Sequence, residues 1–119
     1  MALEIRKDFF ENRQEVLKDL MQTGFWPTTF VSGESPELPL HWHEVEVHTY
    51  VLEGETYIVD GESGERLPVT AGDKIVIPTG TLHAEGIVES RVVYIVALPE
   101  ATNLEPLYDM KQPGTHPPS

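Results

Sequence analysis

The chain has 119 residues, a formal net charge of −12 at pH 7 and no cysteine. This length suits one domain with a single hydrophobic core. The acidic balance argues against nucleic acids and anionic membranes as partners, because both attract basic surfaces. The absence of cysteine excludes disulfides and thiolate sites. No apolar run approaches the roughly 20 residues that a membrane span needs, and the N-terminus lacks a signal-peptide pattern, so we expect a cytoplasmic protein.

Residues 3–23 carry a helical pattern, and residues 1–24 are predicted to form an N-terminal helical segment. Asp8 followed by Glu11 resembles a capping box, and Gly24 is a natural helix end. The apolar positions share one broad stripe: Phe9, Phe10, Val16, Leu17, Leu20 and Met21. A stripe of this kind packs on the domain or on a second copy of the chain.

Residues 25–99 are predicted to form a single β barrel. Short runs rich in β-branched and aromatic residues alternate with clusters of Gly, Pro, Asp and Ser, as in all-β folds. The residues at 60–64 and 71–73 are expected to be turns. The expected strands are Thr28–Val31, His41–Trp42, Val47–Leu52, Thr56–Val59, Arg66–Val69, Lys74–Ile77, Ala84–Val88 and Val92–Leu98.

Residues 100–119 are predicted to form a short C-terminal arm that ends in a frayed tail. Five prolines between positions 99 and 118 rule out regular strands over most of this stretch. Apolar residues in its first half can fasten it to the barrel surface: Leu104, Leu107, Tyr108 and Met110. His116 lies in the tail and is not among the expected ligands.

Two stretches concentrate the histidines. Residues 41–48 read His-Trp-His-Glu-Val-Glu-Val-His, and Gly72 to His83 form the second stretch. Histidine is the commonest protein metal ligand, and its imidazole suits zinc, copper, iron and nickel. Because residues i and i+2 of a strand point to the same face, His41 and His43 can converge on one ion. The pattern predicts a metal site.

The two stretches resemble the paired motifs of the cupin superfamily. The second motif keeps its spacing from Gly72 through Pro78 and Gly80 to His83, although Ile87 stands where the family has Asn. In the first motif His41, His43 and Gly54 keep their distances, whereas Ser35 occupies the position of the opening glycine. The resemblance implies an all-β cupin jelly-roll (double-stranded β-helix) barrel with a metal inside its mouth.

The first motif departs from the family at its glutamate, which would fall at Val47 or His48. If the strand alternates regularly back from Gly54, Val47 faces inward and the ligands are His41, His43 and His83. If the chain bulges by one residue between Glu44 and Val47, His48 also turns inward. We favour the second alternative, with four histidine ligands. A third alternative is a metal-free cupin whose histidines bind an organic ligand.

An all-histidine donor set is neutral and leaves a divalent ion its full charge, which favours binding of an anionic oxygen. The expected cofactor is a divalent transition metal (Fe, Mn, Ni, Zn or Cu), with iron favoured. Glu46 and Tyr50 are the nearest polar groups in sequence and are the candidate catalytic residues. The candidate pocket walls are Tyr50, Leu52, Phe30, Ile75, Ile77 and Tyr94.

The resemblance implies a metalloenzyme with dioxygenase-type chemistry on a small oxygenated organic substrate. The alternatives are a lyase or isomerase that works through a metal-bound enolate and a non-catalytic module that binds a small ligand or metal. A small molecule is the expected partner, with no nucleic acid and no membrane. A homodimer is also expected, because the N-terminal stripe and the C-terminal arm have little core of their own to cover.

Overall fold

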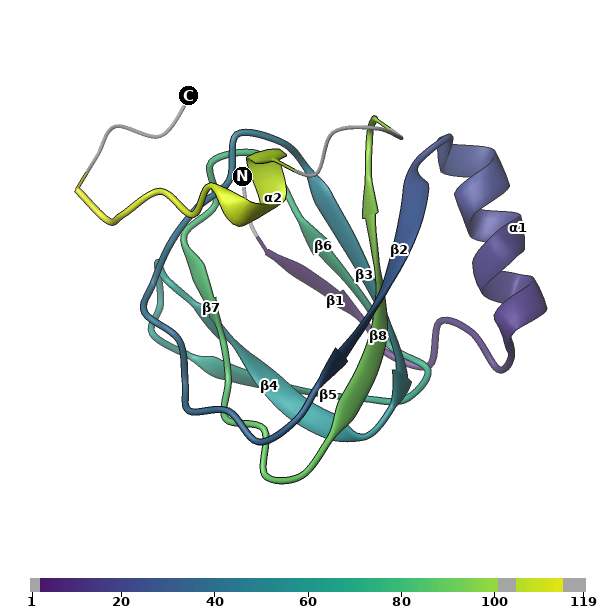
Figure 1. Ribbon diagram of the computed structural model, residues 1–119, viewed down its shortest axis with the longest axis horizontal. Coiled ribbons are helices and arrows are strands. Elements are labelled where there is room, and N and C mark those ends of the chain that lie inside the picture. Colours follow the sequence, from purple (N-terminus) through teal and green to yellow (C-terminus); the bar gives the residue numbers. More distant parts are fainter. Residues whose placement is uncertain (1–2, 101–104, 115–119) are drawn as a thin grey trace.

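The computed structural model describes residues 3–100 and 105–114, and within them the chain forms a β barrel of two antiparallel sheets (Figure 1). One sheet has the strand order β1-β6-β3-β8-β2 and the other the order β5-β4-β7. The strands are β1 (Glu4–Arg6), β2 (Trp26–Ser32), β3 (Val47–Glu53), β4 (Glu55–Asp60), β5 (Arg66–Thr70), β6 (Lys74–Ile77), β7 (His83–Glu85) and β8 (Val92–Leu98). The helices are α1 (Arg13–Thr23), outside the barrel, and the single turn α2 (Glu105–Tyr108), near its upper end in the view.

The predicted strands are found close to their expected bounds because their composition is strongly β-forming. Two differences are notable: β7 ends at Glu85 rather than at Val88, and His41–Trp42 form bridges rather than a full strand. The expected turns at 60–64 and 71–73 are confirmed, since they connect β4 to β5 and β5 to β6.

Gly54 makes the tight turn between β3 and β4. Its φ is +89°, a left-handed conformation that side chains other than glycine rarely adopt. A Cβ atom at this position would lie 2.3 Å from the carbonyl oxygen of Arg91. The glycine that closes the first motif is therefore required by sterics, and β3 ends at this turn.

The prediction of one helix over residues 3–23 is wrong for its first half. Residues 4–6 form β1, which pairs with β6, and Ile5 packs against the barrel core. The helix begins after Asn12, whose side chain accepts a hydrogen bond from the N–H of Glu15, and it ends at Gly24 with φ +77°. Asp8 is not a cap; its N–H donates to Asp73 Oδ1 at 3.0 Å. Edge pairing with β6 outweighed the helical pattern of the first residues.

Two apolar clusters lie on opposite faces of the five-stranded sheet. The inner cluster fills the barrel with residues such as Val51, Val69 and Val92. The outer cluster joins Val16 and Leu20 of α1 to residues of β3 and β8. Full burial of an aliphatic side chain stabilises a fold by about 1.5–3 kcal/mol, so the buried face of α1 holds the helix against the sheet.

The opposite side of α1 is exposed. Leu17 and Met21 of the helix and Trp26 of β2 are all more than half exposed. The homodimer that the sequence suggests stays a prediction. Among the residues that the structure describes, no helix is long and apolar enough to span a membrane.

Candidate metal centre

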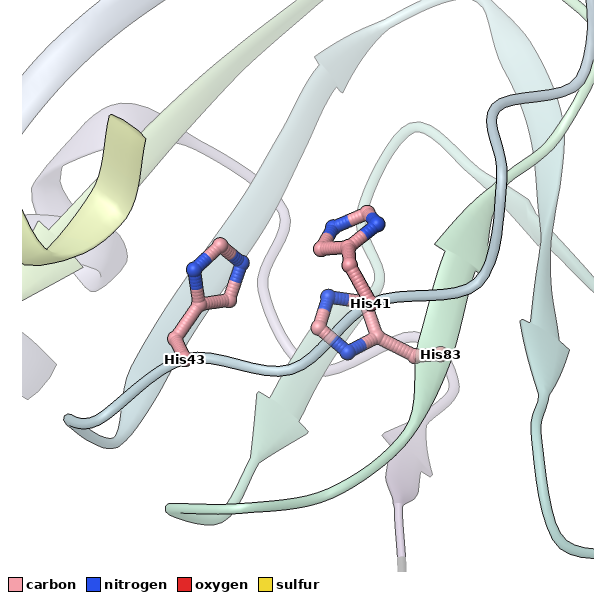
Figure 2. A group of neighbouring side chains, drawn as sticks. All are labelled: His41, His43 and His83. Atoms are coloured by element: carbon pink, nitrogen blue, oxygen red, sulfur yellow. The ribbon is translucent and has the colours of Figure 1, made fainter. Parts of the chain in front are cut away.

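Three histidines from the two sequence motifs meet inside the barrel (Figure 2). His41 and His83 face each other across an antiparallel bridge, in which each backbone N–H donates to the other's carbonyl, at 2.9 and 3.0 Å. The N–H of Gly80 donates to the carbonyl of His43, which ties the second motif to the first a second time. The ring centroids lie between 4.5 and 5.2 Å apart. Backbone pairing thus brings together side chains that are about 40 residues apart in sequence.

The three rings are suited to one metal ion. Each offers a nitrogen, these atoms all lie within 4.8 Å of one another, and all three residues are buried. His41 Nδ1 lies 2.8 Å from the carbonyl oxygen of Pro39, and His83 Nδ1 lies 2.9 Å from that of Thr81. A carbonyl oxygen only accepts, so each Nδ1 carries the proton and each Nε2 keeps its lone pair.

Those two Nε2 atoms are buried and have no hydrogen-bond partner. A buried polar atom without a partner is costly, and metal-ligating histidines are usually oriented by such a bond at their other nitrogen. The residues present therefore fit a divalent transition metal, and imidazole donors suit zinc, copper, iron and nickel.

The histidines lie beside a largely apolar cavity of about 300 Å³. Of the expected pocket walls, Phe30, Ile75, Ile77 and Tyr94 line it, whereas Tyr50 and Leu52 do not. Leu107 of α2 and Met110 also contribute to its wall. Trp42, between two of the histidines, forms a bridge with Lys111, with N···O distances of 3.0 and 2.9 Å. The C-terminal arm is thereby fastened to the segment that carries the ligands.

Glu85 is a residue of the site that the sequence analysis missed. Its Oε2 lies 3.3 Å from His41 Nε2, and its Oε1 lies 3.9 Å from His83 Nε2. Although burial opposes it, the proximity of His41 and His83 lowers the pKa of Glu85 to about 2, so the side chain is a carboxylate at neutral pH. Glu85 follows His83 by two residues in β7, and this spacing, which places both on one face of a strand, was the available signal.

The electrostatic effects differ among the neighbouring rings. Burial lowers the pKa of His41, but the Glu85 carboxylate outweighs it and the net shift is upward. Burial dominates at His83 and lowers its pKa. Tyr94 has a raised pKa because of burial and the nearby carboxylate charge, so its hydroxyl stays protonated and can donate a hydrogen bond in the cavity.

His48 is not brought to this group, so the favoured four-histidine arrangement is not the one that the structure has. In β3 it is Val47 that lines the cavity, while His48 points to the outer face, where its ring stacks on Phe25 with centroids 4.1 Å apart. The chain bends at 44–45, and the pairing of β3 with β8 shifts between Val51 and Glu53. Between these irregularities the side chains alternate regularly, with Val47 and Val51 in the inner cluster and Tyr50 and Leu52 packed in the outer one. The alternative with His41, His43 and His83 describes the observed geometry.

The two candidate catalytic residues also lie away from the three histidines. Glu46 Oε2 is 2.6 Å from His48 Nε2, and Tyr50 is fully buried beneath α1. The Tyr50 hydroxyl and Lys74 Nζ both donate to Asp19 Oδ2, each at 2.5 Å. We call Asp19, His48, Tyr50 and Lys74 the outer-face cluster. Adjacent residues of a strand face opposite sides, and the prediction assigned Tyr50 to the inner face although it lies on the outer one. His116 lies outside the described residues.

A barrel of two antiparallel sheets with histidines at an internal cavity is the architecture expected of a cupin. The family model for the cupin domain matches residues 28–97, and the chain belongs to this family. No protein of the curated set matches the sequence significantly.

Several solved structures resemble the chain. A DUF861 family protein from Thermotoga maritima has a TM-score of 0.58 at 21% identity, over 81% of this chain and 98% of that one. The polyketide cyclase RemF from Streptomyces resistomycificus has a TM-score of 0.54 at 32% identity, over 66% of this chain and 57% of that one. The DMSP lyase DddQ from Ruegeria pomeroyi has a TM-score of 0.54 at 22% identity, over 66% and 39%. The first and third likenesses show the fold alone.

Proposed function

We propose that the protein is a metal-dependent enzyme that acts on a small, largely apolar organic substrate carrying an oxygen donor, with dioxygenase-type chemistry as its reaction. The observation that carries this proposal is the convergence of three buried imidazoles beside an apolar cavity. A pocket of this kind, with few polar groups at one place, is typical of small-molecule sites.

The residues of the chain have distinct roles in this proposal. His41, His43 and His83 would hold the ion, and the bonds from His41 and His83 to backbone carbonyls keep their rings aimed at it. A bound divalent ion would supply Lewis acidity toward an oxygen of the substrate and, if it is iron, redox chemistry with dioxygen. The apolar wall, which includes Phe30 and Ile77, would bind the hydrocarbon part of the substrate and exclude water.

Tyr94 would position the substrate. Its side chain lines the same cavity, and its raised pKa keeps the hydroxyl protonated over the physiological range. A protonated phenol can donate a hydrogen bond to a second oxygen of the substrate, which would fix the orientation of that substrate relative to the histidines.

A second candidate reaction is lyase, isomerase or cyclase chemistry without a redox change. It is supported by the 32% identity with a polyketide cyclase. This chain spans 57% of the length of that protein, so the likeness concerns the barrel and not the whole enzyme. A non-catalytic module that binds a small ligand is the remaining alternative, and the experiment separates all three.

The first measurement is elemental analysis of untagged protein purified without chelator. The proposal expects about one equivalent of a divalent transition metal per chain, and His83→Ala, prepared in parallel, is the control without a complete site. Protein reconstituted with iron(II), and separately with zinc, is then assayed with small dicarbonyl compounds and phenols, with and without dioxygen.

Each outcome has a definite meaning. Oxygen consumption with iron but not with zinc supports the dioxygenase. Turnover of a substrate without dioxygen and with either metal supports lyase, isomerase or cyclase chemistry instead of the dioxygenase. A metal-loaded protein that binds such compounds but turns none over supports the binding module. Failure of the wild-type protein to bind any of the candidate ions would overturn the metalloenzyme.

A further inference from the structure

Glu85 holds an unusual position in the metal centre. It is the only acidic residue among the described residues that line the cavity. Its two oxygens approach two different histidines, Oε2 toward His41 at 3.3 Å and Oε1 toward His83 at 3.9 Å. The contact crosses between the two sequence motifs, since Glu85 and His83 come from β7 and His41 from the segment before β3.

The atoms in this contact are all acceptors. The Nδ1 proton of each histidine points to a backbone carbonyl, so both Nε2 atoms present lone pairs. Both Nε2 atoms, and Oε2 of Glu85, are buried and have no hydrogen-bond partner. Lone pairs that face each other at this distance repel one another unless a cation lies among them. A proton on His41 would join that ring to the carboxylate but would leave His83 Nε2 without a partner, whereas a single metal ion would serve both rings and the carboxylate.

The spacing agrees with shared coordination. Zinc binds imidazole nitrogen and carboxylate oxygen at about 2.0–2.2 Å, so two neighbouring ligand atoms of one ion lie roughly 3.0–3.5 Å apart. The separation of 3.3 Å between Glu85 Oε2 and His41 Nε2 falls in this range. The 3.9 Å between Oε1 and His83 Nε2 is longer than this range, so the carboxylate would have to move toward His83 when an ion binds.

The two acids that follow His43 in the first motif are directed elsewhere. The Glu44 side chain is exposed and lies 3.6 Å from Lys111 Nζ. The position at which the cupin motif has its glutamate is occupied by Val47, which lines the cavity. Glu46, the acid next to it in sequence, contacts His48 on the outer face. The first motif therefore lacks its carboxylate ligand, while the second motif has a carboxylate, Glu85, beside the Nε2 atoms of His41 and His83.

We propose that Glu85 is the fourth protein ligand of the metal, so that the second motif supplies the carboxylate that the first motif lacks. The donor set is then three imidazoles and one carboxylate, and the charge of a divalent ion is reduced from +2 to +1. This inference deepens the proposed function and depends on its metal site. It changes the chemistry of that site, because a less positive ion polarises a substrate oxygen less strongly and favours a higher oxidation state of iron.

The test compares wild-type protein with Glu85→Gln, Glu85→Ala and Glu46→Gln. The glutamine variant keeps the shape of the side chain and removes its charge, and Glu46→Gln is a matched control, since that glutamate lies two residues from a histidine on the other face of the sheet. Circular dichroism establishes that each variant is folded. Zinc affinity is measured by competition with a chromophoric chelator, and cobalt(II) spectra report the ligand field.

The expected result is a loss of zinc affinity of more than tenfold in both Glu85 variants, with an altered cobalt(II) spectrum, and no change in Glu46→Gln. A crystal structure of the zinc-loaded wild type should place a Glu85 oxygen about 2.0–2.2 Å from the ion. A Glu85 oxygen beyond bonding distance, or unchanged affinity and spectrum in Glu85→Ala, would overturn this inference and leave the three-histidine centre intact. Absence of zinc and cobalt binding in the wild type would instead overturn the metal centre, so the two failures are distinguishable.

Discussion

The two faces of β3 carry polar clusters that differ in how their buried groups are paired. On the inner side, Val47, Thr49 and Val51 line the cavity beside the three histidines. On the outer side, His48 and Tyr50 belong to the outer-face cluster beneath α1. Both clusters are buried, and they are separated by the thickness of one sheet.

The difference between them lies in which groups are paired. In the outer-face cluster Asp19 accepts hydrogen bonds from Tyr50 and Lys74, so the buried ammonium has a carboxylate partner. At the inner histidines, Nε2 of His41, Nε2 of His83 and Oε2 of Glu85 all lack a hydrogen-bond partner. Buried groups that pair with one another need no further partner, whereas converging acceptors are costly unless a cation joins them. Converging acceptors from different residues are found on the inner face, where we propose the metal site, while on the outer face His48 Nδ1 also lacks a partner.

The largest expected effect is the loss of metal binding in His83→Ala. His83 is fully buried and provides the one imidazole of the second motif, so no neighbouring side chain replaces it. Removal of a residue that only hydrogen-bonds to a metal ligand lowers metal affinity roughly 10–100-fold. We expect the loss of the ligand His83 itself to lower zinc affinity by more than this. Isothermal titration measures it, with circular dichroism to check the fold. Unchanged affinity would show that the three histidines are not the site.

Asp19→Ala tests the pairing of charges in the outer-face cluster. It leaves Lys74, which is 2% exposed, as an unpaired buried charge, and breaking a buried pair in this way costs roughly 3–5 kcal/mol. Denaturant unfolding measures the loss, and Lys18→Ala, an exposed position on the same helix, is the control. Zinc affinity of the folded variant should match the wild type. A loss of affinity would mean that the two clusters are coupled through the sheet.

The same carboxylate predicts sensitivity to acid. Burial opposes ionisation of Asp19, but hydrogen bonds from Lys74 and Tyr50 outweigh it and lower the pKa of the carboxyl below its ordinary value. Because its pKa is lower in the folded state, ionised Asp19 stabilises the fold above its unfolded pKa of 3.8. This contribution is lost as the pH falls through the pKa of the folded state. Asp19→Ala should therefore unfold with a weaker pH dependence than the wild type below pH 4.

The smallest effect is expected from His48→Gln, which should bind zinc as the wild type does. Burial is the main reason that the pKa of His48 is lowered, and it outweighs the adjacent Glu46 carboxylate. Below the unfolded pKa of 6.5 the unfolded chain therefore binds the proton more readily than the folded one, so stability decreases as the pH falls. The variant should lose part of this slope, measured by unfolding at several pH values. A tenfold loss of zinc affinity would restore His48 as a ligand.

Much of the barrel could be predicted from the sequence because its signals are local. The β-branched runs of β3, β6 and β8 and the turn residues between strands depend on short stretches of chain. The motif spacing identified His41, His43 and His83 for the same reason. The start of α1 was misjudged because the pairing of β1 with β6 is a contact across about 70 residues, which no local pattern reveals.

The misplacement of His48 and Tyr50 has one physical origin. A strand presents successive residues to opposite faces, so an uncertainty of one residue exchanges the whole set of inward side chains. The prediction placed His48, Tyr50 and Glu46 at the metal site because they are close to its histidines in sequence. The alternation of β3 instead directs His48 and Tyr50 to the outer face, beneath α1. Glu85 was overlooked because the motif names His83 and not the residue two places after it, although the same alternation predicts that both face inward.

The bridge between Trp42 and Lys111 joins one wall of the cavity to the segment that carries two of the histidines. Leu107 and Met110, which complete the cavity wall, belong to the arm that this bridge fastens. Residue 42 lies between His41 and His43, so the arm is anchored to the backbone that sets the spacing of these two rings. A displacement of the arm at Lys111 would therefore also disturb the backbone between His41 and His43, and with it the geometry of two of the proposed ligands.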